Sequence, residues 1–299
     1  MTDSSLLIPK DAKITLVPTR PGRRIWEIDF LRGLCILLMI LDHLAMLLGS
    51  YFGPAWFGSG MAGDSAAFCR WCAWFHDSEA RRIAHGVVVF VFFSISGTSC
   101  AFSRSNVRRG LILACVAMLY TGATYAAESL FNVGVIRVTF GVLHCYAACI
   151  LIWALINILV RRNTVAATII SAAIVVTVAC LYYLYTPPVD TPKWLAPLFP
   201  YIDANGNPPL FYDPSEFSPG DTFNLIPYAA FFFTGTMLSP ILYPRKYSLL
   251  PFLDGKWNKP VCFVGKYSIF FYLFHVVALA AVLMLVSYLF ITPGDWVLV

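Results

Sequence analysis

The sequence predicts an all-α protein, a polytopic membrane helix bundle with about seven transmembrane helices. Composition is the first reason: 59% of the 299 residues are hydrophobic and 12% are charged, whereas soluble domains have roughly 45–50% apolar and about 25% charged residues. The second is a series of long apolar runs, and the third is an uneven distribution of basic residues. So few charged side chains do not suffice for a water-facing surface, which excludes soluble enzymes, nucleic-acid-binding proteins and disordered proteins.

Each expected span is an apolar run long enough for a bilayer, whose hydrocarbon core of about 30 Å needs roughly 20 helical residues. The runs are Phe30–Leu48, Ile83–Phe102, Leu111–Ala127, Val138–Val160, Val165–Tyr185, Asn224–Tyr243 and Val261–Ile291. The third run is short and the last is long, so their ends are the least well defined. A β-barrel would need short segments of alternating hydrophobicity, whereas these runs are continuous.

The orientation of the bundle follows from Lys and Arg, which favour the cytoplasmic side. With a cytoplasmic N-terminus, most basic residues lie inside: Lys10, Lys13, Arg20, Arg23, Arg24, Arg104, Arg108, Arg109, Arg161, Arg162, Arg245, Lys246, Lys256, Lys259 and Lys266. Arg70, Arg81, Arg82, Arg137 and Lys193 lie outside, together with most acids, including Asp190, Asp203, Asp213, Glu216 and Asp221. We therefore expect the N-terminus in the cytoplasm and the C-terminus outside.

The chain is expected to form one membrane domain, residues 25–299, preceded by a basic cytoplasmic tail, residues 1–24, that lies on anionic lipid. No cleavable signal peptide is visible, because no small-residue cleavage site follows the first apolar run. Two outer loops are long, residues 49–82 and 186–223. Loops of this length are often functional or disordered.

Cysteines mark the outer loop as well as the spans. Seven of the nine lie in or beside apolar runs, where buried cysteine usually acts as a small hydrophobe. Cys69 and Cys72 form a Cys-x-x-Cys pair in the first outer loop, with His76 and Asp77 close behind. A metal site would need further ligands at suitable spacing, so no metal is expected. A local disulfide or an inert pair is favoured over a redox motif.

The first span carries an unusual set of ionisable residues: Asp29, Arg32, Asp42 and His43. Because helical residues are about 100° apart, Arg32 and His43 share one face within roughly 20° and lie about 16 Å apart along the axis. Asp29 falls near the same stripe. Ionisable groups inside a membrane are costly and tend to mark function. The alternative is an interfacial Asp29–Arg32 ion pair and a histidine bonded to a neighbouring carbonyl.

Other spans add polar groups to this set. His85 opens the second run, His144 lies early in the fourth, Asn224 opens the sixth and His275 lies midway along the last. For any single one of these histidines, a hydrogen-bonded core residue is an equally good interpretation. Arginine suits phosphate or carbonyl oxygen, and histidine accepts a proton from a hydroxyl or amine. The set therefore suits transfer of an acyl group from a phosphate-bearing cytoplasmic donor.

Five segments resemble known membrane proteins. Residues 24–33 (Arg-Ile-Trp-Glu-Ile-Asp-Phe-Leu-Arg-Gly), running on to His43, resemble the start of bacterial relatives of heparan-α-glucosaminide N-acetyltransferase. Residues 92–99, 140–144, 226–235 and 264–275 resemble later segments of that family in the same order. The spacing of Arg32 and His43 is also similar to the Arg-x10-His signature of the wider transmembrane acyltransferase superfamily. The resemblance spans residues 24–275.

This resemblance implies an acetyl-CoA-dependent acyltransferase of the bacterial inner membrane, which transfers an acyl group, usually acetyl, to a sugar hydroxyl or amine across the bilayer. It implies catalytic roles for His43, Arg32 and Asp29. We expect the donor to contact Arg32, Arg104, Arg108, Arg109, His144, Lys266 and His275. We expect the acceptor, a sugar or glycolipid, to contact Trp56, Trp71, Trp74, His76 and Asn224. Interfacial anchoring is an equally good interpretation of the tryptophans. Lipids are the other expected partners, no nucleic acid is expected, and a homodimer is left open.

One departure leaves the catalytic histidine open. In lysosomal members it lies in the loop after the first helix, and asparagine stands at the position that matches His43. Residues 49–60 contain no histidine here. Either His43 takes the role, which we favour, or His76 does. The lysosomal enzyme is also larger, so heparan sulfate is not implied as acceptor.

Three other functions are weighed against this one. A transporter or flippase of a polar lipid or sugar would also use intramembrane His and Arg, but no inverted repeat is visible. A retinal-binding receptor needs a lysine within its last helix, and Lys266 stands only at the start of that run. A structural scaffold predicts that Arg32 and His43 tolerate substitution.

Overall fold

The structure is a computed structural model and describes residues 24–103, 105–131, 136–184, 197–199, 220–244 and 246–290. These residues are mostly helical and contain no strand. Seven of their helical segments are long and apolar enough to cross a membrane. This confirms the predicted all-α, multi-pass bundle.

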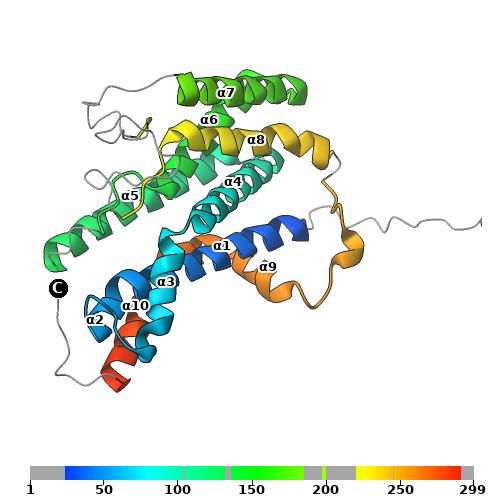
Figure 1. The fold of residues 1–299 in the computed structure, drawn as a ribbon. Coiled ribbons are helices and arrows are strands. Elements are labelled where there is room, and N and C mark those ends of the chain that lie inside the picture. The colour runs from blue at the N-terminus through cyan, green and yellow to red at the C-terminus, as the bar shows by residue number, and fades with distance from the viewer. Residues whose placement is uncertain are drawn as a thin grey trace, which may run out of the picture.

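The helices follow one another in the order of Figure 1. They are α1 (Trp26–Met46), α2 (Gly53–Phe57), α3 (Ala67–Asp77), α4 (Glu79–Phe102), α5 (Asn106–Phe131), α6 (Val142–Leu159), α7 (Thr164–Leu184), α8 (Leu225–Leu242), α9 (Lys259–Lys266) and α10 (Ser268–Phe290). A π-helical stretch, Leu47–Phe52, joins α1 to α2, and short 3₁₀ turns cover Asp64–Ala66 and Pro251–Leu253.

The second span begins at Glu79 rather than Ile83 and the fourth at Val142 rather than Val138, and the larger corrections concern the first, third and last spans. The first span continues as helix to Phe57, and the third runs from Asn106 to Phe131. Hydropathy reports the apolar stretch only, whereas backbone hydrogen bonding carries the helices into more polar sequence. The last expected span, 261–291, is two helices that meet at Tyr267, whose φ of −106° and ψ of 26° interrupt the helix. Of the two, α10 has the length of a membrane span.

The segment expected as a long first outer loop, residues 49–82, is largely helical. It contains the end of the π-helical stretch, α2, α3 and the first turn of α4. Most of the second expected loop, 186–223, lies outside the described residues.

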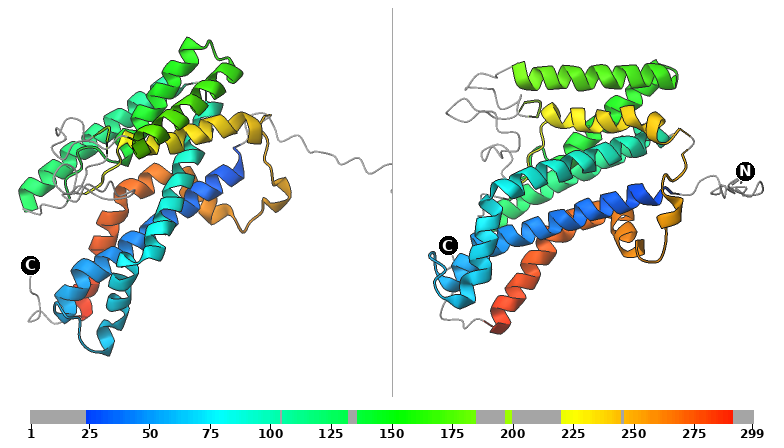
Figure 2. Two further views of the ribbon diagram at one scale, coloured as in Figure 1. Left: turned by 45° about the horizontal axis from the view of Figure 1, so that its top comes forward. Right: turned by 45° about the vertical axis from the view of Figure 1, so that its right-hand side comes forward.

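The helices pack in successive layers. In Figure 1, α8 lies between α7 and α4, and α1 lies between α4 and α9; α6 packs against α5. Figure 2 shows that α1 begins near the connection to α9, whereas α10 ends beside α2. An indole hydrogen bond joins the chain at each of these two ends. The Trp26 N–H donates to the Leu250 carbonyl at the first, and the Trp56 N–H donates to the Ser287 hydroxyl at the second. The described chain therefore begins and ends at opposite ends of the bundle.

Glycines bring two helix pairs into backbone contact. A Cβ atom added at Gly33 would overlap the Val261 carbonyl of α9, and one added at Gly265 would overlap the Asp29 carbonyl of α1. Gly97 and Gly235 make the equivalent close approach between α4 and α8. Small residues at a crossing let membrane helices approach closely and gain van der Waals contact.

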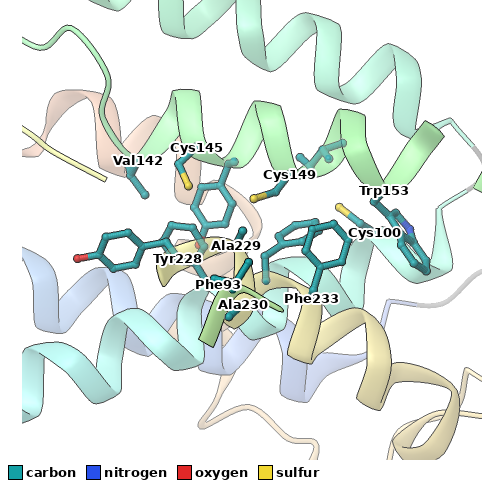
Figure 3. Packing of buried hydrophobic residues seen from close by; sticks show 14 of the residues in the cluster. Phe93, Cys100, Val142, Cys145, Cys149, Trp153, Tyr228, Ala229, Ala230 and Phe233 are labelled. Atoms are coloured by element: carbon teal, nitrogen blue, oxygen red, sulfur yellow. The ribbon is translucent and has the colours of Figure 1, made fainter. Parts of the chain in front are cut away.

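The main apolar core lies between α4, α6 and α8. Phe93 of α4 is fully buried and stacks on Tyr146 of α6, with ring centroids 4.2 Å apart. Figure 3 shows Cys145 and Cys149 of α6 above the ring of Phe93. These thiols are free and buried, so they fill the core as small hydrophobes.

The Cys-x-x-Cys pair is a packing element. Cys69 and Cys72 are free thiols on the buried side of α3, and Gly49 of the π-helical stretch closely approaches Cys72 and Ala73. A disulfide, one of the two forms expected for this pair, is therefore not present; the thiols have the inert form. Burial raises the pKa of both thiols, which keeps them protonated and unreactive at neutral pH.

Candidate functional site

The charged start of α1 is a buried ion-pair network. Arg32 is 13% exposed at its side chain, and its Nη1 lies 3.3 Å from Oδ1 of Asp29. Its Nη2 donates to the Ser99 hydroxyl of α4 at 2.6 Å. Asp29 also pairs with Arg24 at 3.2 Å. Arginine has five N–H donors, so these two contacts leave part of the guanidinium available to a ligand.

A pair of histidines lies farther along α1. The rings of His43, on α1, and His275, on α10, meet edge to face with centroids 4.7 Å apart. Each Nδ1 points at a backbone carbonyl of its own helix: that of His43 lies 2.9 Å from the Met39 oxygen, and that of His275 lies 2.6 Å from the Tyr272 oxygen. We call these two rings the imidazole pair.

The carbonyl contacts fix the tautomers of the imidazole pair. A carbonyl oxygen only accepts, so both Nδ1 atoms carry the proton and both Nε2 atoms present a lone pair in the neutral form. Among the described residues, Nε2 of His275 is buried and has no hydrogen-bond partner. A buried lone pair without a protein partner is available to a ligand.

A bidentate ion pair borders the imidazole pair. Nε and Nη2 of Arg81 donate to the two carboxylate oxygens of Asp42, at 2.7 and 2.5 Å, and so tie α4 to α1. His85 lies within electrostatic range of Arg81, Asp42 and His43. In the sequence, Arg81 lies in an expected outer connection and has no predicted role. The one available signal was an unpaired Asp42 within an apolar run.

The buried carboxylate of Asp221 also lies near the imidazole pair. Asp221 precedes α8, and its Oδ2 accepts from the Tyr272 hydroxyl at 2.5 Å and from the Val142 N–H at 3.0 Å. Burial raises the pKa of Asp221, while these hydrogen bonds and the nearby His43 oppose the rise. In the sequence, Asp221 is one of the expected outer acids, because nothing local marks it as buried.

Several expected site residues have structural contacts. His144 accepts from the Gly141 N–H through Nδ1 and contacts Thr121 through Nε2, so it caps α6. Asn224 is buried and donates to the Phe199 carbonyl. Trp56 donates to Ser287 and thereby attaches α2 to α10. Roles for these residues in binding a ligand remain predictions.

Other expected ligand contacts are accessible. Arg108, Arg109 and Lys266 are exposed, and Arg104 lies outside the described residues. Trp71 and Trp74 are 51% and 67% exposed. His76 lies 3.6 Å from the Asp77 carboxylate.

Two groups of ionisable side chains lie at different positions along α1. Arg32 and Asp29 lie at its start, and the imidazole pair lies about 16 Å farther along. Within the part of the chain that the structure describes, no group of three or more His, Cys, Asp or Glu side chains is placed to hold a metal. The features that come together are two histidine rings, one buried carboxylate and one ion pair.

These features define a multi-pass membrane protein with ionisable groups inside its helix bundle. A family model described as heparan-alpha-glucosaminide N-acetyltransferase, catalytic, matches residues 63–277, more than half of the chain. The chain belongs to this family, which indicates a membrane acetyltransferase that acts on sugar-type acceptors. No curated protein and no solved structure matches the chain.

The matched range bears on the choice of site residues. It begins after α2, so Arg32 and His43 lie outside it. His85, Asp221, Tyr272 and His275 lie within it. The Arg-x10-His spacing of α1 is therefore an argument separate from the family match.

Proposed function

We propose that this protein transfers an acyl group, usually acetyl, from cytoplasmic acetyl-CoA to a hydroxyl or amine of a sugar-containing acceptor on the outer side of the bacterial inner membrane. The imidazole pair carries the proposal: two rings 4.7 Å apart, each with its Nδ1 proton held by a carbonyl. Such rings are preorganised general bases, and general base catalysis contributes about 10²–10⁴-fold to rate.

The reaction needs one proton acceptor and one leaving group. Nε2 of His43 takes the proton of the acceptor hydroxyl or amine while that oxygen or nitrogen attacks the thioester carbonyl carbon. The carbon–sulfur bond breaks, and the proton passes from His43 to the departing CoA sulfur. In the alternative route, His43 first carries the acyl group; both routes use the same lone pair.

The charge distribution suits the donor. CoA phosphates are anionic, and exposed Arg108 and Arg109 at the start of α5 offer cationic contacts. Arg109 lies within electrostatic range of Arg32, so the phosphate contacts and the start of α1 belong to one region. The remaining N–H groups of Arg32 suit a pantetheine or acyl carbonyl.

The acceptor is expected at the opposite end of α1. Trp71 and Trp74 of α3 are exposed there, and aromatic faces stack on sugar rings. Trp71 lies between Phe68 and Phe75 in a ladder of parallel rings, with centroids 5.9 and 5.5 Å apart. The bound sugar would then lie on the same side as the imidazole pair.

The test uses the purified full chain in nanodiscs with radiolabelled acetyl-CoA and amino sugars as acceptors. His43→Ala and His275→Ala are compared with Tyr183→Ala, which changes an exposed ring of α7. We expect at least a 100-fold loss of transfer for His43→Ala and wild-type rates for Tyr183→Ala. Wild-type transfer by His43→Ala would remove His43 from the mechanism. Substrate movement across the bilayer without acetyl-CoA consumption would favour the transporter.

A further inference from the structure

The backbone around Asp221 holds its carboxylate against the first turn of α6. The Gly220 N–H donates to the Arg137 carbonyl at 2.9 Å, and the Phe223 N–H donates to the Phe140 carbonyl at 3.3 Å. A Cβ atom added at Gly141 would overlap Oδ2 of Asp221. The absence of a side chain at position 141 therefore lets the carboxylate reach the end of the helix.

Local contacts of this position offset part of the cost of burying a negative charge. Oδ2 accepts the Val142 N–H at the start of α6, where unpaired N–H groups and the helix dipole stabilise anions. Tyr120 of α5, Cys145 of α6, Tyr272 of α10 and His43 of α1 interact electrostatically with Asp221. His43 is the group among these that becomes a cation when it accepts a proton.

Tyr272 connects the carboxylate to the imidazole pair. Its hydroxyl donates to Asp221 at 2.5 Å, and its carbonyl accepts from Nδ1 of His275 at 2.6 Å. Tyr272 and His275 are one helical turn apart on α10, with ring centroids 6.0 Å apart. Asp221 therefore fixes the turn of α10 that sets the direction of the His275 lone pair.

We propose that Asp221 is a positioning residue for the imidazole pair. Through Tyr272 it holds His275, and its negative charge stabilises the imidazolium that forms when His43 removes the acceptor proton. Asp221 neither gains nor loses a proton in this step: the proton moves from the acceptor to Nε2 of His43 and then to the CoA sulfur. The role rests on the proposed function, and it resembles that of a carboxylate behind a catalytic histidine.

Two variants of the full chain separate charge from hydrogen bonding. Asp221→Asn keeps the size and an acceptor oxygen for Tyr272 but removes the charge. Tyr272→Phe keeps the ring and the charge but removes the hydroxyl. We expect Asp221→Asn to lower kcat about 100-fold, the scale for one preorganised electrostatic group, with little change in KM for acetyl-CoA. We expect a smaller fall in kcat for Tyr272→Phe.

The pH–rate profile distinguishes this role from a purely structural one. Without the carboxylate, a positive charge on the imidazole is less stable, so the acid limb of the profile moves to lower pH in Asp221→Asn. In Tyr272→Phe, which keeps the Asp221 charge, the acid limb stays at its wild-type pH. The groups that bear on this titration are His275 of α10, Asp42 of α1, and Arg81 and His85 of α4. A wild-type kcat and profile in Asp221→Asn would overturn the proposal.

A second measurement does not depend on activity. NMR titration of the histidine rings in the full chain, with the His43 signal assigned through His43→Gln, reports the same shift to lower pH. If wild type transfers no acetyl group, the proposed function fails, while this titration still decides the effect of Asp221. An unchanged titration in Asp221→Asn overturns the proposal. If Asp221→Asn does not fold, Tyr272→Phe decides, and a wild-type kcat for that variant overturns it.

Discussion

At the scale of single residues, the Asp42–Arg81 pair is a two-point contact beside the imidazole pair. Both side chains are largely buried, at 17% and 23% exposure, and the contact is bidentate. Planar two-point contacts of this kind combine charge with fixed geometry. They position the end of α1 relative to α4, and with it the ring of His43.

Loss of one partner should therefore cost stability. We expect Arg81→Ala to lower the free energy of unfolding by about 2 kcal/mol, because it leaves the Asp42 carboxylate without its partner. The exposed Glu79–Arg82 pair is the matched control, and Arg82→Ala should cost at most about 1 kcal/mol. Denaturant unfolding in detergent measures both. Equal costs would show that the buried pair adds no special stability.

The thiols of α3 give a second residue-scale prediction. Because burial raises the pKa of Cys69 and Cys72, each has less thiolate at pH 7 than an ordinary cysteine. Alkylation by a maleimide should be slow in the folded protein, fast after unfolding, and should accelerate only at a pH above that needed for a free thiol. Mass spectrometry after proteolysis locates the label. Rapid labelling of native protein would contradict the packing described for α3.

At the scale of elements, the glycine crossings decide how closely helices approach. Gly265→Val would force α9 away from the Asp29 carbonyl of α1, and overpacking of this kind costs typically 1–3 kcal/mol or more. We expect a lower melting temperature and weaker acetyl transfer, since α9 leads into the helix that carries His275. Gly122→Ala in α5 is the control, because no atom lies within 4 Å of the added Cβ. It should be neutral or stabilising by up to about 1 kcal/mol, and an equal loss in both variants would refute this reading.

Sequence patterns predicted the elements well where continuous hydrophobicity alone identifies a helix. Apolar runs located the seven spans, because burial in hydrocarbon demands a continuous apolar stretch. They missed the break at Tyr267, since apolar residues continue on both sides of it. They also missed the helices of residues 49–82, whose apolar and polar residues mix.

The part of the site that depends on local sequence was predictable, and the part that depends on helix packing was not. The face shared by Arg32 and His43 follows from helical periodicity alone. The contact of His43 with His275 depends on how α1 and α10 pack, and no local pattern encodes it. Arg81 and Asp221 resembled ordinary charges of outer connections, because burial of a single charge is a tertiary property.

At the scale of the whole molecule, the two ends of the described chain lie at opposite ends of the bundle. An odd number of spans requires this, and seven candidate spans agree with it. We propose that the basic tail lies in the cytoplasm, and we therefore expect alkaline phosphatase fused after residue 299 to be active outside the cell. The same enzyme fused after Arg162, in the connection between α6 and α7, should be inactive. The reverse pattern would invert the orientation and the proposed direction of transfer.

The interruption of the helix at Tyr267 determines where α10 places His275 relative to His43. α9 is fastened to α1 through Gly265, and α10 leaves this fixed point at a new angle with His275 two turns farther along. The distance between the His43 and His275 rings therefore depends on the angle between α9 and α10 at Tyr267. A continuous helix through Tyr267 would move the His275 ring away from the His43 ring, although neither histidine is changed.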